Sequence, residues 1–298
     1  MKRVVSVSGG KTSSYIFANY PSDHAVFSLV TTDDKECLYP DKKIRKIVSD
    51  KIGKEFIGTL EMDVIIKVML DLEQFVGKKI DWVCGDTFEN IVSKPGVLPN
   101  VKTRYCTTEL KLKPIFQWWY KKFNDPVEMA IGYRANEQRR AKKMIERLNK
   151  NGLLEIKETV SKHKNGRNKW QIFEWQKPIF PLIDAKKPIF KDQIEAYWKD
   201  KPVNFGKEYH NNCVGCFHRN PLLLKKMWET HTNKMNWFSK QEKIKKRKIE
   251  KTQNRKVSKY VYAQWKRDMT YEEIKNWKLQ QQISFDDFSD CDSGFCGL

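Results

Sequence analysis

Short strand-like segments alternate with helical segments through the first half of the chain. The strand-like segments are apolar and lie at Arg3–Ser8, His24–Thr31, Asp81–Cys84 and Val127–Gly132. Apolar residues at helical spacing mark the segments between and after them, at Lys11–Asn19, Lys42–Ile52, Asp63–Phe75, Glu109–Phe123 and Glu137–Asn149. This alternation is typical of βαβ units. The sequence therefore predicts an α/β fold with a mostly parallel sheet.

The pattern changes after Asn151. Residues 152–176, with the turn sequence KNGRNK, predict a β-hairpin that is carried as an insertion. Further on, the chain has a cysteine-containing turn, a long basic helical region and a tail that ends in CDSGFCGL. We therefore expect one α/β domain, residues 1–205, followed by a helical, cysteine-containing extension and tail, residues 206–298.

The chain is strongly basic. It has 57 Lys and Arg against 37 Asp and Glu, which gives a net charge of +20. A field of this sign attracts polyanions, nucleic acid first and anionic nucleotides second. The densest basic tract, Lys240–Lys256, is the predicted contact for tRNA or DNA. The alternative is a lysine-rich surface without a binding role, because the excess is spread along the chain.

The absence of long apolar runs and the number of cysteines indicate the compartment. No apolar run approaches the roughly 20 residues that span a bilayer. The N-terminus has no apolar segment long enough for a signal peptide. We therefore expect a cytoplasmic protein with no membrane partner. In that compartment the seven cysteines favour metal binding or thiol chemistry over a disulfide framework.

The first strand leads directly into the sequence SGGKTSS, residues 8–14, and then into a helix. Glycines let the backbone approach an anion closely, and the new helix adds the positive end of its dipole. The candidate phosphate-binding residues are Ser8, Gly9, Gly10, Lys11, Thr12 and Ser13. The spacing matches neither the Walker loop nor the GxGxxG fingerprint. An ordinary tight turn with a Ser/Thr helix cap is the alternative.

This loop resembles the SGGxDS pyrophosphate-binding loop (PP-loop) of the adenine nucleotide α-hydrolase superfamily. Four further stretches resemble the phosphoadenosine phosphosulfate (PAPS) reductase family, in the same order and at similar spacing. They are TRYCTTELKLKP at 103–114, GYRANEQRR at 132–140, PIFPL at 178–182 and NCVGC at 212–216. The resemblance implies a Rossmann-like sheet that binds an adenine nucleotide, either PAPS or ATP.

The resemblance also implies roles for residues outside the loop. Arg104 and Lys111 would bind phosphate or sulfate groups, which suit the donors of Arg and Lys. Gly132 and Arg134 would contribute to the nucleotide pocket, and Thr32, after the second strand, to the adenine or ribose site. Ordinary solvated charges on helix surfaces are the alternative for the basic residues.

Three cysteines correspond to cluster ligands of the iron–sulfur reductases in this family, namely Cys106, Cys213 and Cys216. A [4Fe–4S] cluster needs four thiolates. Cys291 is the predicted fourth ligand, and Cys296 is the alternative. A four-cysteine zinc site is the alternative, since CxxC pairs also suit tetrahedral zinc. Free thiols are the third interpretation.

Cys296 is the predicted catalytic residue. Thiol-dependent PAPS reductases carry their nucleophilic cysteine in a C-terminal ECGLH sequence, and this chain ends in FCGL. A thiolate at this position would attack the sulfate sulfur and lead to sulfite, with a thiol reductant as partner. Thr12 stands where ATP-cleaving members carry Asp, which also favours sulfonucleotide reduction.

Two other functions stay open at this stage. The basic tract favours sulfur transfer to tRNA or DNA, which would use ATP, Mg²⁺ and a sulfur donor. The other is a non-catalytic nucleic-acid-binding protein whose CxxC holds structural zinc.

Overall fold

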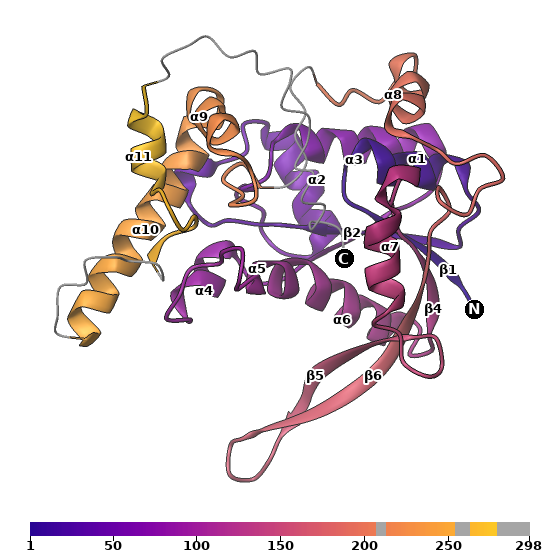
Figure 1. Ribbon diagram of the computed structural model, residues 1–298, viewed down its shortest axis with the longest axis horizontal. Coiled ribbons are helices and arrows are strands. Elements are labelled where there is room, and N and C mark those ends of the chain that lie inside the picture. The colour runs from indigo at the N-terminus through magenta and orange to yellow at the C-terminus, as the bar shows by residue number, and fades with distance from the viewer. Residues whose placement is uncertain (207–212, 254–262, 279–298) are drawn as a thin grey trace.

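The computed structural model describes residues 1–206, 213–253 and 263–278, and its centre is a six-stranded sheet (Figure 1). In spatial order the strands are β3 (Asp81–Cys84), β2 (His24–Leu29), β1 (Arg3–Val7), β4 (Val127–Ala130), β6 (Asn168–Ile179) and β5 (Leu154–Lys162). All neighbouring pairs are parallel except β5 and β6. The prediction of an α/β fold with a mostly parallel sheet is confirmed.

Helices α1 to α3, and the helices that connect β3 to β4, follow the predicted alternation. They are α1 (Lys11–Asn19), α2 (Lys42–Ile52), α3 (Val64–Val76), the short α4 (Phe88–Ser93) and α5 (Tyr105–Thr107), and α6 (Lys113–Lys122). A π-helical turn, Thr108–Leu112, joins α5 to α6. Glycine ends α2 and α3, because Gly53 and Gly77 adopt the left-handed conformation that closes a helix without a Cβ clash.

The remaining helices are α7 (Gln138–Ile145), α8 (Lys191–Lys199), α9 (Pro221–Thr230), α10 (Thr232–Gln253) and α11 (Tyr271–Asn276). Asn220 caps α9 by accepting a hydrogen bond from the Leu223 N–H, and Pro221 occupies the first turn. Among the described residues, no helix has the length and apolarity that crossing a membrane requires.

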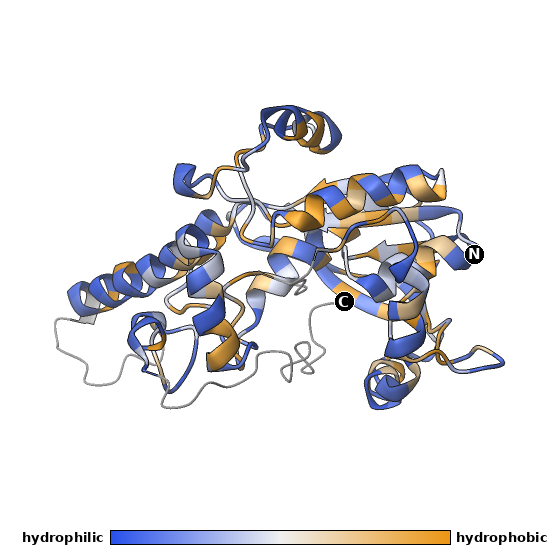
Figure 2. Ribbon diagram, turned by 90° about the horizontal axis from the view of Figure 1, so that it is seen from above, coloured by the Kyte–Doolittle hydropathy of each residue, from blue (hydrophilic) through white to orange (hydrophobic). Residues whose placement is uncertain are grey.

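Apolar residues cover both faces of the sheet, because successive residues of a strand point to opposite sides. On one side Val5, Val7 and Phe27 pack with buried residues of α1, α2 and α3. On the other side Val4 and Val26 pack with buried residues of α6 and α7. Figure 2 shows this concentration of apolar residues on the strands and on the helices that cover them. The fold is therefore a three-layer arrangement whose open side is the carboxyl edge of the sheet.

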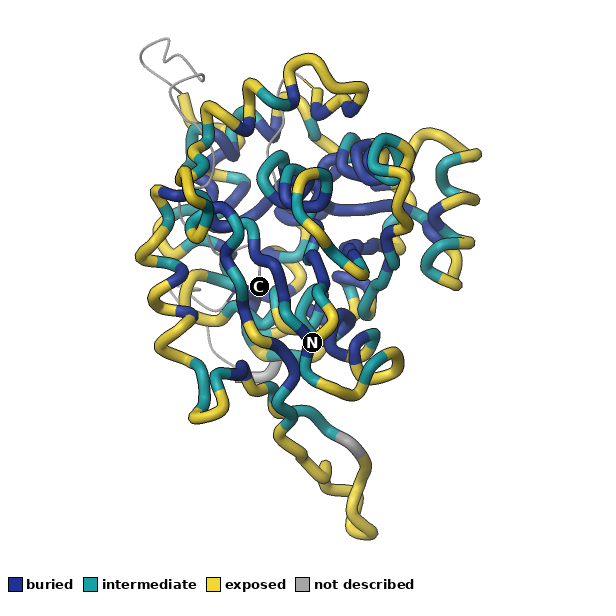
Figure 3. Tube along the Cα trace, turned by 90° about the vertical axis from the view of Figure 1, so that its right-hand side faces the viewer, coloured by how far each residue is buried: buried dark blue, intermediate teal, exposed yellow. Residues whose placement is uncertain are grey.

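The predicted hairpin is present, but its second strand also belongs to the central sheet. The twelve-residue β6 pairs antiparallel with β5 along its first part and parallel with β4 from Gln176 to Ile179. Residues 177–179 are therefore part of the hairpin strand and of the central sheet. The outer part of the hairpin extends away from the body of the protein (Figure 3).

The C-terminal helices share an aromatic core with α4. Phe88 lies 5.1 Å from Trp237 and 6.0 Å from Trp265, measured between ring centroids. Phe238 lies 5.1 Å from Trp265 and 6.1 Å from Tyr271. Aromatic pairs at these separations add to the free energy gained from burying their surface. Helices α10 and α11 are in this way fixed to the α/β part of the chain.

Part of the predicted polyanion contact, Lys240–Lys256, is buried instead. The Lys245 ammonium donates to the carbonyls of Val92 and Pro95, both at 2.6 Å, and is almost fully buried. Lys248 donates to the carbonyl of Ser93 at 2.9 Å. The carbonyls of Val92 and Ser93 lie in the last turn of α4, where backbone carbonyls have no partner within the helix, so the two lysines stabilise the helix end. Residues 254–256 of the tract lie outside the described residues.

Glu242 of α10 joins two other parts of this region. Its carboxylate accepts hydrogen bonds from the backbone N–H groups of Trp265 (3.1 Å) and Tyr271 (2.8 Å). Burial raises the pKa of Glu242 from 4.5 to about 8, and the two hydrogen bonds only partly oppose it. The folded state therefore favours the protonated carboxyl group near neutral pH.

The free energy of unfolding should fall as the pH rises. The contribution of Glu242 is fully present below pH 4.5 and is lost as the pH rises through about 8, a loss on the order of a few kcal/mol. Glu242→Gln does not titrate and should remove this part of the pH dependence. Urea unfolding at several pH values measures the slope, with the exposed Glu146→Gln as the control. Identical slopes in the two variants would contradict the assignment.

Candidate nucleotide-binding site

The loop between β1 and α1 lies at the carboxyl edge of the sheet. Gly9 has a φ of +77°, a conformation that a side chain would strain. The Ser13 hydroxyl donates to the Gly10 carbonyl and accepts from the Ser8 N–H, both at 3.1 Å. The N-cap residue of α1 is Gly10, which has no capping side chain, and the first turn of the helix has no acidic residue. The loop is thus fixed from within, and the positive end of the helix faces outward from the sheet edge.

The end of β4 packs directly against this loop. A Cβ on Gly132 would lie 3.4 Å from the Ser13 nitrogen and 3.5 Å from the Thr12 Cγ2. Both segments follow adjacent parallel strands, because β1 pairs with β4. The structure therefore brings Gly132 together with the predicted loop residues.

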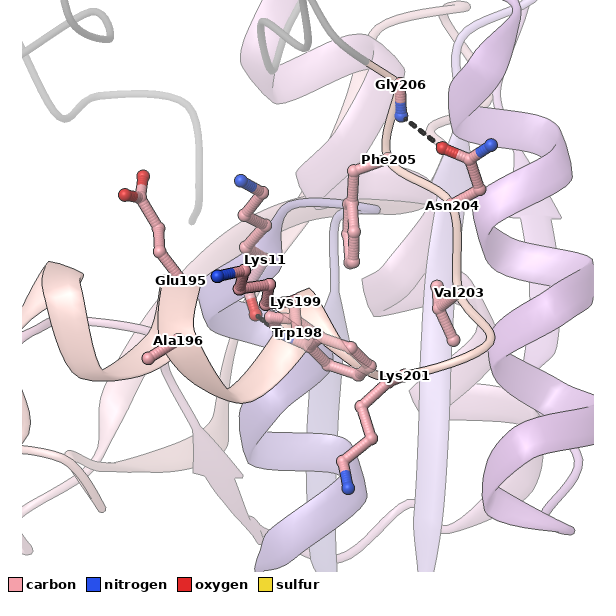
Figure 4. Close-up of a pocket in the computed structure, with 10 residues that line it drawn as sticks. All are labelled: Lys11, Glu195, Ala196, Trp198, Lys199, Lys201, Val203, Asn204, Phe205 and Gly206. Carbon is pink, nitrogen blue, oxygen red and sulfur yellow. Dashed lines mark hydrogen bonds between the residues drawn. The ribbon is translucent and has the colours of Figure 1, made fainter.

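A pocket of about 560 Å³ borders the loop at Lys11 (Figure 4). Helix α8 and residues 203–206 form its other walls, with the rings of Trp198 and Phe205 among them. The Trp198 indole N–H donates to the Lys11 carbonyl at 2.9 Å, which holds α8 against α1. Lys199 and Lys201 also line the pocket, against a single acidic residue, Glu195. This charge balance suits an anionic ligand.

Sequence reasoning missed Lys199 and Lys201. They lie in the sequence YWKDKP, which contains no recognisable motif, among 57 Lys and Arg residues. Only the packing of α8 on α1 brings them near Lys11.

Thr32 and Arg134 lie at strand ends as predicted, and both have partners within the protein. The buried Thr32 hydroxyl donates to the Glu89 carboxylate, which ties the end of β2 to α4. The N–H and Nε of Arg134 donate to Glu137 at 2.9 and 3.0 Å, and Arg140 pairs with the same carboxylate. Although burial opposes it, the Arg134 N–H and the two guanidinium groups hold the pKa of Glu137 below its ordinary value.

The cysteine turn is attached to the end of β2 through residues 58–61. Thr32 forms a backbone bridge with Gly58, and Glu61 forms one with Cys213. The Val214 N–H donates to the Leu60 carbonyl at 2.8 Å. We call the segments around Cys106, Cys213 and Cys216 the thiol region. It lies on the β2 side of the sheet edge, whereas the β1–α1 loop lies between the ends of β1 and β4.

Three polar side chains, two of them buried, donate hydrogen bonds to the backbone of the cysteine turn, residues 213–219. The Arg219 Nε donates to the Cys213 carbonyl (3.2 Å), and the Tyr271 hydroxyl donates to the Gly215 carbonyl (2.9 Å). The Lys266 ammonium donates to the carbonyls of Phe217 and Arg219 at 3.0 and 2.9 Å. Satisfying buried carbonyls in this way avoids a cost of about 1–3 kcal/mol for each unpaired group.

Cys106, Cys213 and Cys216 lie close enough to affect one another electrostatically. Burial, and next the neighbouring Cys216, raise the pKa of Cys106 to about 11, against the opposing charge of Arg104. Burial and the Glu61 carboxylate raise the pKa of Cys213. In the absence of a metal the Cys106 and Cys213 thiols are therefore protonated near neutral pH.

Lys111, a predicted anion ligand, pairs with Glu61 across the thiol region. The ammonium donates to Glu61 Oε1 at 3.0 Å, and the Glu61 side chain is 1% exposed. The second carboxylate oxygen, Oε2, is buried without a hydrogen-bond partner among the described residues. Glu61 was not predicted, and no sequence signal distinguishes it from other acidic residues.

The donor chemistry of the three thiols suits a thiolate-bound metal, but their placement does not complete such a site. Within the described part of the chain, no three His, Cys, Asp or Glu side chains converge to hold a metal ion. The predicted fourth ligand, Cys291, and the predicted nucleophile, Cys296, lie outside the described residues.

Comparison of the chain with protein-family models, with curated proteins and with solved structures gave no match. The interpretation of the site therefore depends on its residues and geometry. Those residues form two groups along one sheet edge, the β1–α1 loop with Gly132 and the thiol region with Arg104 and Lys111.

Gly215→Ala should destabilise the protein by about 1–3 kcal/mol, the usual cost of overpacking a filled core. A Cβ on Gly215 would lie 2.3 Å from a ring carbon of Phe238, so the ring or the turn must move. Denaturant unfolding measures the change. Gly96→Ala is the control, because a Cβ there would meet no described atom within 4 Å. Recovery of stability on adding Phe238→Leu would support the clash, and equal stability of the two alanine variants would refute it.

Proposed function

We propose that this chain is an enzyme of the PAPS reductase family that binds an adenine nucleotide through a PP-loop at residues 8–13. The observation that carries the proposal is the contact of Gly132 with Thr12 and Ser13 beside the uncapped start of α1. The strand order also supports the proposal. From β1 the chain continues to β2 and β3 on one side of the sheet, and then returns to place β4 on the other side of β1. In a Rossmann-like sheet this reversal of strand order is where nucleotides bind.

The charges along the sheet edge support an anionic ligand with several charged groups. Lys11, Lys199 and Lys201 line the pocket beside the loop. Arg104 and Lys111 lie in the thiol region. In the proposed arrangement the loop holds the phosphates, and residues 206–298 form a C-terminal extension that carries the cysteine turn.

Reduction of a sulfonucleotide to sulfite is the reaction that we propose. A cysteine thiolate attacks the sulfate sulfur, so that a sulfur–sulfur bond forms and the adenosine phosphate leaves with the electron pair of the broken S–O bond. A second thiol then attacks the enzyme sulfur, which releases sulfite and leaves a disulfide. A thiol reductant returns the disulfide to two thiols. Cys296 is the proposed nucleophile, and no step uses a metal.

ATP-dependent sulfur transfer to tRNA or DNA is the second candidate. The net charge of +20 favours it, as do the exposed Lys240, Arg247 and Lys251 of α10. This reaction would require Mg²⁺ to neutralise the phosphates of ATP and a sulfur donor.

Lys11→Ala should weaken the binding of PAPS and of ATP about 10- to 100-fold, since it removes a charged donor from the phosphate site. The fold should be unaffected, because the Lys11 contact to Trp198 uses the backbone carbonyl. Isothermal titration measures the affinities, and thermal unfolding checks the fold. Lys143→Ala, on the exposed surface of α7, is the matched control. Nucleotide affinity equal to that of the control would reject the PP-loop.

Product analysis distinguishes the reactions. Anaerobically purified protein is given PAPS with a thiol reductant, or Mg-ATP with and without nucleic acid. We expect sulfite from PAPS, and a loss of at least about 100-fold in rate in Cys296→Ser. Pyrophosphate from ATP that increases with nucleic acid would favour sulfur transfer instead. If neither product forms, a non-catalytic binding protein becomes the better explanation. Iron, sulfide and zinc contents of the same preparation test the predicted cluster and its zinc alternative.

A further inference from the structure

The outer part of the β5–β6 hairpin, residues 157–172, is a two-stranded ribbon that projects from the body of the protein (Figures 1 and 3). We call these residues the arm. The base of the hairpin is well anchored, because Phe173 lies 5.2 Å from Phe116 of α6 and Trp175 is buried. A ribbon held firmly at one end presents its outer part at a fixed place on the surface.

The arm is strongly basic. It contains Lys157, Lys162, Lys164, Arg167 and Lys169, and its one acidic residue is Glu158. All five basic residues are exposed. Within the described part of the chain, the ion pairs recorded involve none of them. Their charge is therefore not neutralised by an ion pair with a described residue.

The arm also exposes large apolar side chains. Trp170 is 52% exposed and Ile172 is 59% exposed. They are two residues apart on one strand, so they share a face of the ribbon. Lys157, which is opposite Ile172 in register, has its ammonium 5.7 Å from the centre of the Trp170 ring. This combination of exposed aromatic and basic groups is typical of a surface that contacts nucleic acid.

We propose that the arm binds duplex DNA by entering its major groove. Two strands about 4.8 Å apart with their side chains fit a groove about 12 Å wide, which admits a two-stranded ribbon. The deep, narrow major groove of A-form RNA does not admit such an element. The basic residues near the turn would contact the phosphates, and Trp170 and Ile172 would face the base edges, including thymine methyl groups.

The arm and the nucleotide site lie at opposite edges of the sheet. Strand β6 runs from the arm toward Ile179 and is parallel to β4, whose carboxyl end carries Gly132. The arm therefore projects beyond the amino edge and would hold the protein on DNA without placing DNA in the nucleotide site. This inference does not depend on the proposed reaction, and nucleotide affinity provides a separate readout.

The test is the quadruple variant Lys162→Ala, Lys164→Ala, Arg167→Ala, Lys169→Ala in the full chain. A control removes four exposed lysines of α2 and α3 instead, by Lys42→Ala, Lys43→Ala, Lys46→Ala and Lys67→Ala. Both variants lose the same net charge. Fluorescence anisotropy with a labelled duplex of about 20 base pairs, at about 50 and about 200 mM salt, measures binding.

We expect the arm variant to bind the duplex at least about 10-fold more weakly than the control variant. For the arm variant, the slope of log K against the logarithm of the salt concentration should become shallower by about 0.9 for each phosphate contact that is lost. Trp170→Ala, with the charges intact, should weaken binding about 3- to 10-fold and leave the salt dependence unchanged. Thermal stability and nucleotide affinity should match those of the unaltered protein.

Equal loss of DNA affinity in the arm and control variants would overturn the proposal, because it would show that only the net charge matters. Tighter arm-dependent binding to a single strand, to duplex RNA or to tRNA would overturn the assignment to duplex DNA. If the unaltered protein binds no nucleic acid and the arm variant changes the oligomeric state, the arm is a protein contact and the proposal is wrong.

Discussion

The pairing of β1 with β2 on one side and β4 on the other is the constraint on which the rest of the structure depends. Because these strands are parallel, the segments that follow them all emerge at one edge of the sheet. The strand order reverses between β1 and β4, and Gly132 permits the close approach of their two loops. This edge positions three features, namely the β1–α1 loop, the pocket beside α8 and the thiol region.

Buried polar groups connect the C-terminal helices to that edge. Arg219, Lys266 and Tyr271 donate to carbonyls of the cysteine turn, and Glu242 accepts from the backbone of the segment that contains Trp265 and Tyr271. An unsatisfied buried carbonyl is costly, so the turn and these helices stabilise each other. The position of the cysteine turn therefore depends in part on Lys266 and Tyr271, which are more than 40 positions away in the sequence from the carbonyls that they bind.

The strands and most helices of the first half were predictable because local hydrophobic periodicity determines them. The loop at residues 8–13 and the location of Gly132 after a strand were predictable for the same reason, whereas the pairing of that strand with β1 was not. The π-helical turn at Thr108–Leu112 and the short α4 were not, since neither has a distinct pattern. The sequence also presented Lys240–Lys256 as one basic surface, whereas Lys245 is buried at the end of α4.

By itself the sequence determined the α/β class, the glycine- and serine-rich loop after the first strand and the hairpin with its basic turn. These properties follow from residues that are neighbours along the chain. Tertiary structure decided that Lys111 pairs with Glu61, that Lys199 and Lys201 join Lys11 at one pocket, and that the hairpin projects from the amino edge of the sheet. Each of these depends on which distant segments pack together, because electrostatic and hydrogen-bond partners are chosen by distance in space.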